Sequence, residues 1–337
     1  MASTDVKLSD REMPKQKGLF TGLPSRMFRE KPLGVVGFFI VVILFLTGIF
    51  ADFIAPEKAT ENSPGYNIIH LADRFHPPSA EYPLGADQLG RDVFSRIIYG
   101  ARLSMIVAVV ATTIHEFVST AIGVSCAYFG GKFDLLVQRF VDGWICFPPL
   151  IMLIALMAIL GSGMLQILLC LGIIGGISSS RFKRSLVFAI RENQYIFASE
   201  SIGATSGYVM LHQILPNIMP MIFVMFSINM GGMILTEASL SFLGLGLPPP
   251  YPSWGGMISG EGRANVISAP WIMLWPGLVL SLVVFGINMF GDAVRDLLDP
   301  RLRGGLGSYR LSHTEKISQK KQQKMLAFKI RIDKVNK

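Results

Sequence analysis

Long uncharged apolar runs recur along the 337-residue chain and are separated by polar segments. A helix needs about 20 mostly apolar residues to cross a bilayer, so these runs predict transmembrane helices. The six predicted spans cover residues 33–54, 103–128, 145–160, 164–178, 219–245 and 271–290. The pattern therefore predicts an all-α, polytopic membrane protein.

The segments around these spans divide the chain into five parts. They are a mostly disordered leader at 1–32 with an interfacial turn at 19–29, the first transmembrane helix at 33–54, a loop at 55–102, a core of five helices at 103–292 and a basic tail at 293–337. The end of the tail, residues 318–337, is compatible with a basic surface helix and equally with a disordered segment.

Charge predicts how the chain lies in the membrane. The leader, the polar segment 181–218 and the tail hold 23 of the 31 Lys and Arg residues, so both termini are predicted to be cytoplasmic. The loop 55–102 has five basic and six acidic residues, which is typical of the outer side. Within it, residues 83–102 carry apolar side chains at helical spacing and predict an amphipathic helix along the outer surface.

Composition narrows the class of protein further. Hydrophobic residues make up 51% of the chain and charged residues 16%, whereas about a quarter of the residues in a soluble domain are charged. The net charge of +8 lies mostly at the two ends. This placement favours anionic membrane lipid as a partner and argues against a nucleic-acid site.

Motifs that would supply energy or catalysis are incomplete. A phosphate-binding loop ends in Gly-Lys-Ser/Thr, but the Gly-Lys step at 131–132 is followed by Phe133. The zinc-protease pattern His-Glu-x-x-His begins at His115 and Glu116 and fails at Ser119. The three cysteines lie in apolar segments without zinc-site spacing. We therefore predict no enzyme activity, no metal and no cofactor.

Three ionisable residues, His115, Glu116 and Glu237, fall in the interior of predicted spans, where such groups are costly. His115 and Glu116 admit two interpretations: a proton or metal step, or pairing with polar groups on a neighbouring helix, with Glu116 alternatively facing a water-filled cavity. Glu237 lines a polar path in one interpretation and forms a hydrogen-bonding staple between helices in the other.

The polar island at 195–217 lies between the fourth and fifth predicted spans. We expect a short helix from about residue 196, a turn at Gly203, where glycine removes the side-chain barrier, and entry to the fifth span at Pro216. In the functional interpretation a partner protein binds this helix, about residues 196–205, and its motion moves the adjoining spans. In the alternative it is an ordinary connecting loop.

The island resembles the cytoplasmic signature of permease subunits of ATP-binding cassette importers. That signature is Glu-Ala-Ala, three residues, Gly, and then Ile-x-Leu-Pro. The matching positions are Ala198, Ser199 for the second Ala, Gly203, and Leu215 with Pro216.

Further motifs point to one branch of this family. Residues 83–104, 237–258 and 291–303 resemble the motifs of the second permease subunit of dipeptide, oligopeptide and nickel importers. The resemblance covers about residues 30–303. One departure is Phe197, which stands where the family has Glu; the carboxylate of Glu200 lies about one turn further along the same face.

The resemblance implies a type I importer permease fold with six spans in the cell (inner) membrane. It implies a sister permease, two ATPase subunits, an extracytoplasmic solute-binding protein, and di- or oligopeptide cargo, with nickel or a nickel chelate as the alternative. A passive channel and an intramembrane enzyme are the alternatives of other classes. The residues expected to contact the ATPase are Ala198, Ser199, Glu200, Gly203 and Ala204, with Leu215 and Pro216 ending the coupling loop.

Overall fold

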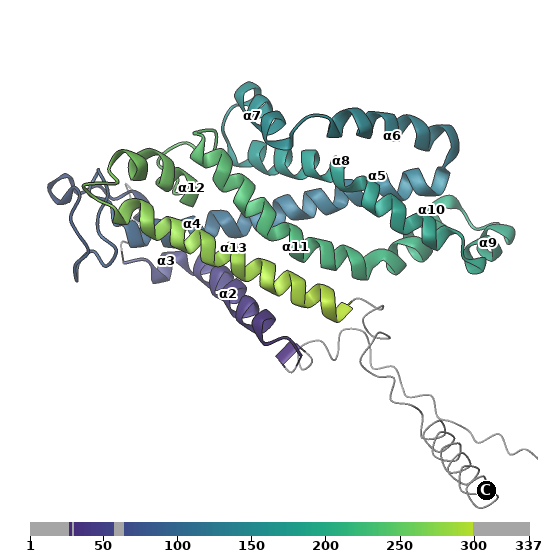
Figure 1. The fold of residues 1–337 in the computed structure, drawn as a ribbon, viewed down its shortest axis with the longest axis horizontal. Helices are drawn as coiled ribbons and strands as arrows, with labels where there is room; N and C mark the ends of the chain where they lie inside the picture. The colour runs from purple at the N-terminus through teal and green to yellow at the C-terminus, as the bar shows by residue number, and fades with distance from the viewer. Residues whose placement is uncertain (1–26, 29, 57–63, 299–337) are drawn as a thin grey trace, which may run out of the picture. The chain divides into compact units, whose positions relative to one another are not determined.

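The computed structural model describes residues 27–28, 30–56 and 64–298 (Figure 1). These residues belong to one compact unit that ends at Leu298. The predictions of a disordered leader, of an interfacial turn at 19–29 and of a surface helix or disordered segment at 318–337 fall wholly or almost wholly outside the described residues.

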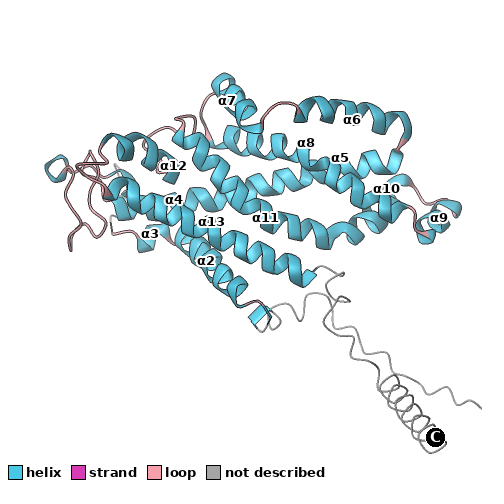
Figure 2. Cartoon of the chain, in the orientation of Figure 1, coloured by secondary structure: helices cyan, strands magenta, loops and turns pink. Residues whose placement is uncertain are grey.

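Helices make up nearly all of the regular structure in this part of the chain (Figure 2). The α-helices are α2 (Pro32–Ile49), α3 (Ala51–Ile54), α4 (Val93–Ile106), α5 (Thr112–Phe129), α6 (Gly131–Ile145), α7 (Pro149–Leu160), α8 (Met164–Arg191), α9 (Gln194–Ser201), α10 (Ser206–Tyr208), α11 (Leu215–Phe242), α12 (Trp254–Met257) and α13 (Trp271–Leu298). Three π-helical segments, η3 (Val107–Ala111), η4 (Val209–Ile214) and η5 (Ile258–Gly262), and two 3₁₀ turns, η1 (Gly65–Asn67) and η2 (Leu71–Asp73), complete them. The described residues contain no strand, which confirms the all-α prediction.

Within residues 27–28, 30–56 and 64–298, five helical segments are long and apolar enough to cross a membrane. They are Pro32–Ile49, Val93–Phe129, Met164–Arg191, Ser206–Phe242 and Trp271–Leu298. The remaining prediction, the third span at 145–160, falls on α6 and α7, which could form a sixth span only together and are bent by 87° at the break between them. The structure therefore confirms a polytopic helical protein with five or six candidate spans.

The prediction of a separate amphipathic surface helix over residues 83–102 is wrong. The helix begins later than predicted, and it is continuous with the second span. Helix α4 begins only at Val93, because the Asp92 carboxylate caps it by accepting from the backbone N–H groups of Phe94 and Ser95. The residues before it form turns, with Gly85 and Gly90 at positive φ. From Val93 the helix continues without a break into α5, so this segment is the start of a span.

The third predicted span, 145–160, is also revised. The apolar helix α7 has 12 residues, about 18 Å, and is too short to cross a hydrocarbon core of about 30 Å. The preceding polar return is itself the 15-residue helix α6. Pro148 is extended, with ψ at 127°, and separates the two helices because a residue before proline disfavours the helical region.

Pro216 does not mark the entry to the fifth span, because the helical segment already begins at Ser206 and runs to Phe242. The π-helical turns of η4 immediately precede the proline. A wider π turn accommodates a position where proline has no N–H to donate, so the helix continues.

Helix packing places the island at one end of the bundle. Helices α5 and α8 pack most closely against each other, and a Cβ added at Gly123 of α5 would lie 2.8 Å from the backbone oxygen of Ser180. Glycine there permits the close approach. In Figure 1, α9 lies at one end of the bundle and α12 at the opposite end. The island is thus held at a bundle end by α8 and η4.

Candidate functional site

Helix α9 is short, and two backbone hydrogen bonds close the turn at its C-terminal end. It stops in a paired turn: the Gly203 N–H donates to the Glu200 carbonyl and the Ala204 N–H donates to the Ser199 carbonyl, both at 3.0 Å. This pair of bonds is a Schellman motif, and it requires a left-handed residue after the helix. Gly203 supplies it with φ +88°, so the predicted turn is confirmed and its reason is local.

One buried side chain anchors α9 to the bundle. Ile196 is fully buried and belongs to an apolar cluster built from α5, α8, η4 and α11. Three hydrogen bonds add to this anchor. They join Tyr128 Oη to Glu200 Oε1 at 3.0 Å, Gln213 Nε2 to Ser199 Oγ at 2.5 Å, and Asn217 Nδ2 to Tyr195 Oη at 3.0 Å. Because the partners lie on α5 and on the η4–α11 segment, a displacement of α9 acts on two spans at once.

The outer side of α9 is exposed and partly apolar. Ala198 is exposed, Phe197 is 56% exposed, and Ile202 in the following turn is 87% exposed. Large apolar side chains grouped at a bundle end are typical of a protein contact surface.

The structure brings the predicted residues from Ala198 to Ala204 together on α9 and its turn. Glu200 and Gly203 are exposed, while Ser199 and Ala204 are half-buried and face the bundle. Leu215 and Pro216 lie apart from this turn, at the start of α11. The Glu200 carboxylate accepts the Tyr128 hydroxyl within the chain, so one of its oxygens is engaged there.

A second polar group lies inside the bundle. Glu116 of α5 is 5% exposed, and its Oε2 lies 2.6 Å from Nζ of Lys183 on α8. Its Oε1 accepts from Asn229 Nδ2 of α11 at 2.9 Å and lies 3.3 Å from His115 Nδ1. The other ring nitrogen of His115 is 2.9 Å from the Ser179 hydroxyl. Three spans therefore meet at one carboxylate, as the pairing interpretation of His115 and Glu116 expects.

Lys183 and Asn229 were missed by the sequence analysis. Lys183 lies in the run Arg181-Phe182-Lys183-Arg184, which resembles an ordinary cytoplasmic basic cluster, yet its side chain is 1% exposed. The signal that could have located Lys183 is the Glu116 carboxylate, because a carboxylate inside a span needs a cation nearby.

One of the two intramembrane carboxylates lines a cavity, and the hydrogen-bond partner of the other lines a second one. Glu116 lines a largely apolar cavity of 660 Å³ between α5, η4 and α11, together with Thr113 and Thr120. Glu237 is 2% exposed and accepts the Ser241 hydroxyl, four residues on in the same helix, at 2.6 Å. That bond lies within α11, so it is not a staple between helices. Ser241 in turn lines a cavity of 500 Å³ near α12.

Within the described residues, no group of three or more His, Cys, Asp or Glu side chains is arranged to hold a metal ion. All three cysteines are free; Cys126 and Cys170 are buried and Cys146 is exposed.

Comparison with known proteins identifies the family. Residues 119–304 match the binding-protein-dependent transport system inner membrane component family, and residues 25–78 match the N-terminal TM domain of oligopeptide transport permease C. A dipeptide transport system permease protein of Alkalihalophilus pseudofirmus is 37% identical over 278 residues, which cover 82% of this chain and 89% of that protein. Glutathione transport system permease proteins of Escherichia coli and Shigella boydii are 36% identical over 279 residues, covering 83% of this chain and 90% of theirs.

These matches confirm the resemblance stated from the motifs and do not favour the nickel alternative. The family is a membrane component and is not itself catalytic. The chain belongs to the inner-membrane components of binding-protein-dependent transport systems, and it is a multi-pass permease subunit of an ATP-binding cassette importer.

Proposed function

We propose that this chain pairs with a sister permease to form the membrane path of an importer for di- or oligopeptides. The relatives named for dipeptide and glutathione transport support this class of cargo. An extracytoplasmic binding protein delivers the peptide, and two ATPase subunits supply the energy. Both termini, and α9, lie in the cytoplasm.

In this proposal α9 is the coupling helix. The observation that carries the assignment is its combination of a rigid end, anchors on two spans and an exposed face bearing Ala198, Phe197 and Ile202. An ATPase that binds this face more tightly in one nucleotide state biases the equilibrium between two arrangements of the spans. A short helix with a fixed C-terminal turn transmits that motion without absorbing it.

Ser199, Glu200, Gly203 and Ala204 then have different tasks from Ala198. Ala198 contacts the ATPase directly, whereas the other four hold α9 in place through the bonds described above. Leu215 and Pro216 lie within the span that receives the motion, at the start of α11. We also propose that Glu116 lines the path at the 660 Å³ cavity, while His115 and Glu237 serve packing within the bundle.

The test is a bulky substitution on the exposed face, Ala198→Trp, in the assembled importer reconstituted in vesicles. We expect ATP-driven dipeptide uptake to fall at least about tenfold, because an indole displaces a packed contact. Ala155→Trp on α7, also exposed and far from α9 in the sequence, is the matched control and should transport normally.

Three outcomes distinguish the alternatives. Normal uptake by the Ala198→Trp importer contradicts the coupling role. Peptide flux that continues without ATP indicates a passive channel. Uptake of labelled nickel in place of labelled dipeptide would overturn the cargo while leaving the coupling role intact.

A further inference from the structure

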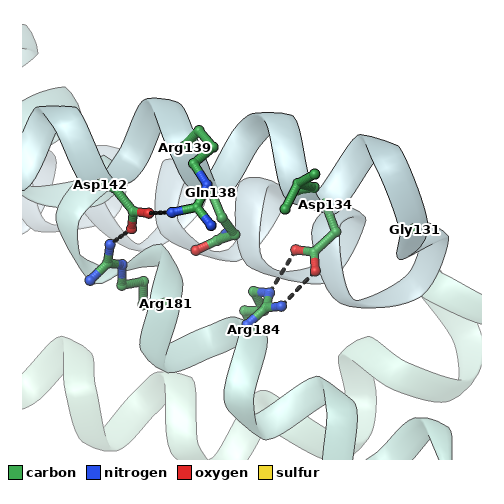
Figure 3. A pocket seen from close by; sticks show the side chains of 8 residues that line it. Gly131, Asp134, Gln138, Arg139, Asp142, Arg181 and Arg184 are labelled. Carbon is green, nitrogen blue, oxygen red and sulfur yellow. Dashed lines mark hydrogen bonds and ion pairs between the residues drawn. The ribbon is translucent and has the colours of Figure 1, made fainter.

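Helix α6 is attached to α8 by ion pairs, and the cavity between them carries an unbalanced charge (Figure 3). Arg184 donates to Asp134 through two nitrogens, Nε at 2.6 Å and Nη2 at 2.5 Å. This fork satisfies the Asp134 carboxylate and leaves that pair neutral.

The second carboxylate in the cavity is shared. Asp142 pairs with Arg139 on its own helix at 3.0 Å and with Arg181 of α8. Among the residues that the structure describes, three guanidiniums thus face two carboxylates in this cavity, so one positive charge is left over. The cavity has a volume of 430 Å³, and the side chains of Arg139 and Arg181 are 73% and 45% exposed. The surplus charge is therefore accessible from outside the subunit.

The position of this charge along α8 places it near a bilayer surface. Arg181 is the first charged residue of α8 after Met164. At about 1.5 Å per residue it lies about 26 Å along the axis from Met164, close to the hydrocarbon thickness of about 30 Å. Lipid headgroups begin at this depth, where an exposed guanidinium meets phosphate.

Helix α6 also exposes an apolar stripe next to the charge. Phe133, Leu136 and Phe140 are spaced at three and four residues, so they share one face, and they are 47%, 70% and 57% exposed. Arg139 directly precedes Phe140 and follows Leu136 by three residues, so it stands at the edge of this stripe. An acyl chain on the stripe brings its headgroup to Arg139.

We propose that this notch, lined by Arg139, Asp142 and Arg181 and flanked by the α6 stripe, binds the headgroup of an anionic phospholipid. Basic pockets between membrane helices recognise such headgroups, and a guanidinium donates a pair of charge-assisted hydrogen bonds to a phosphate. The apolar stripe favours a lipid over a soluble anion, because a soluble anion would gain nothing from it. The inference does not depend on the cargo or on the coupling role of α9.

The experiment measures bound lipid on the purified full-length chain by native mass spectrometry, with phosphatidylglycerol and phosphatidylcholine supplied in equal amounts. We expect the unmodified chain to retain phosphatidylglycerol with about tenfold preference. Arg139→Gln should abolish the preference, since it removes the surplus charge while Arg181 still pairs with Asp142 and holds α6. Lys132→Gln removes one charge from an exposed position of α6 outside the cavity and should keep it.

Circular dichroism of each variant checks that the helices are intact. Equal retention by Arg139→Gln and the unmodified chain overturns the proposal, as does an equal loss in Lys132→Gln, which would show general charge attraction. Displacement of phosphatidylglycerol by millimolar inorganic phosphate would assign the notch to a soluble anion. Displacement by a dipeptide with a free carboxylate, and not by its amide, would assign it to the transport path. Either displacement refutes the lipid assignment.

Discussion

At the scale of single residues, the stability of the bundle depends on a buried ion pair between Lys183 and Glu116. Both side chains are almost fully buried, at 1% and 6% exposure, and their charged atoms lie 2.6 Å apart. Removing two charges from water is costly, and the pair compensates only while both members are present.

We expect Lys183→Met to destabilise the protein by about 3–5 kcal/mol, because it leaves the Glu116 carboxylate buried without its cation. The double variant Glu116→Gln with Lys183→Met should recover most of this loss. Thermal unfolding in detergent measures both, with Lys132→Met on the exposed face of α6 as the control expected within about 0.5 kcal/mol. A double variant as unstable as the single one would show that the pair acts through shape and not through charge.

A second residue-scale expectation concerns pH. The hydrogen bond from Arg102 to Asp52, 2.7 Å long, holds the pKa of the Asp52 carboxyl below its ordinary value of 3.8. A carboxyl whose pKa is lower in the folded state contributes stability above the unfolded value and loses it as pH falls through the folded value. The contribution is less than about 1 kcal/mol, because the Asp52 side chain is 55% exposed.

Asp52→Asn should therefore lower the melting temperature slightly at neutral pH, and the gap to the unmodified chain should close below about pH 3.8. Melting curves of the two proteins across this range provide the measurement. A gap that stays constant down to the most acidic sample would mean that the carboxylate charge has no part in the contact.

At the scale of elements, the end of α9 depends on backbone conformation alone. A Cβ at Gly203 would meet nothing within 4 Å, so space does not require glycine there, but the φ of +88° does. Gly143 in α6 is also unobstructed and has an ordinary helical conformation. The two glycines therefore separate conformational strain from crowding.

We expect Gly203→Ala to strain the turn by about 1–2 kcal/mol and to reduce ATP-driven uptake, because α9 loses its fixed end. Gly143→Ala should leave uptake unchanged, since alanine is the better helix former. Transport in reconstituted vesicles compares the two. If both variants transport like the unmodified importer, a rigid end of α9 is unnecessary for coupling.

At the scale of the whole molecule, the proposed orientation predicts which surfaces each side of the membrane can reach. Ala80, in the segment between α2 and α4, and Ser201, at the end of α9, are both exposed. In a Cys146→Ser background, which removes the exposed native thiol, we expect Ala80→Cys to react with a membrane-impermeant maleimide in intact cells. Ser201→Cys should react only after the cells are opened. The reverse labelling pattern would invert the topology and exclude α9 as a cytoplasmic coupling helix.

The amino-acid sequence by itself determined the features that depend on local chemistry. Uncharged runs of membrane length predicted the spans, and the spacing from Ala198 to Gly203 located α9, because a helix end and its left-handed glycine involve only neighbouring residues. The limits of that reasoning appear at Val93 and Pro216. There a capping aspartate and a π turn, both short-range but not visible in the apolar pattern, place the helix boundaries elsewhere.

Only the tertiary structure decided which distant groups meet. The pairing of Glu116 with Lys183 and Asn229, and of Asp142 with Arg181, joins residues from different helices. A pattern of apolar and polar positions predicts that a helix has a buried face but not which partner lies opposite. The packing of α5 against α8, where Gly123 lets the two backbones approach, brings Lys183 to Glu116. The packing of α11 against α5 and of α6 against α8 decides the other two pairs. Tertiary packing likewise decides the anchoring of α9 on α5, η4 and α11 and the meeting of charges at the α6 notch.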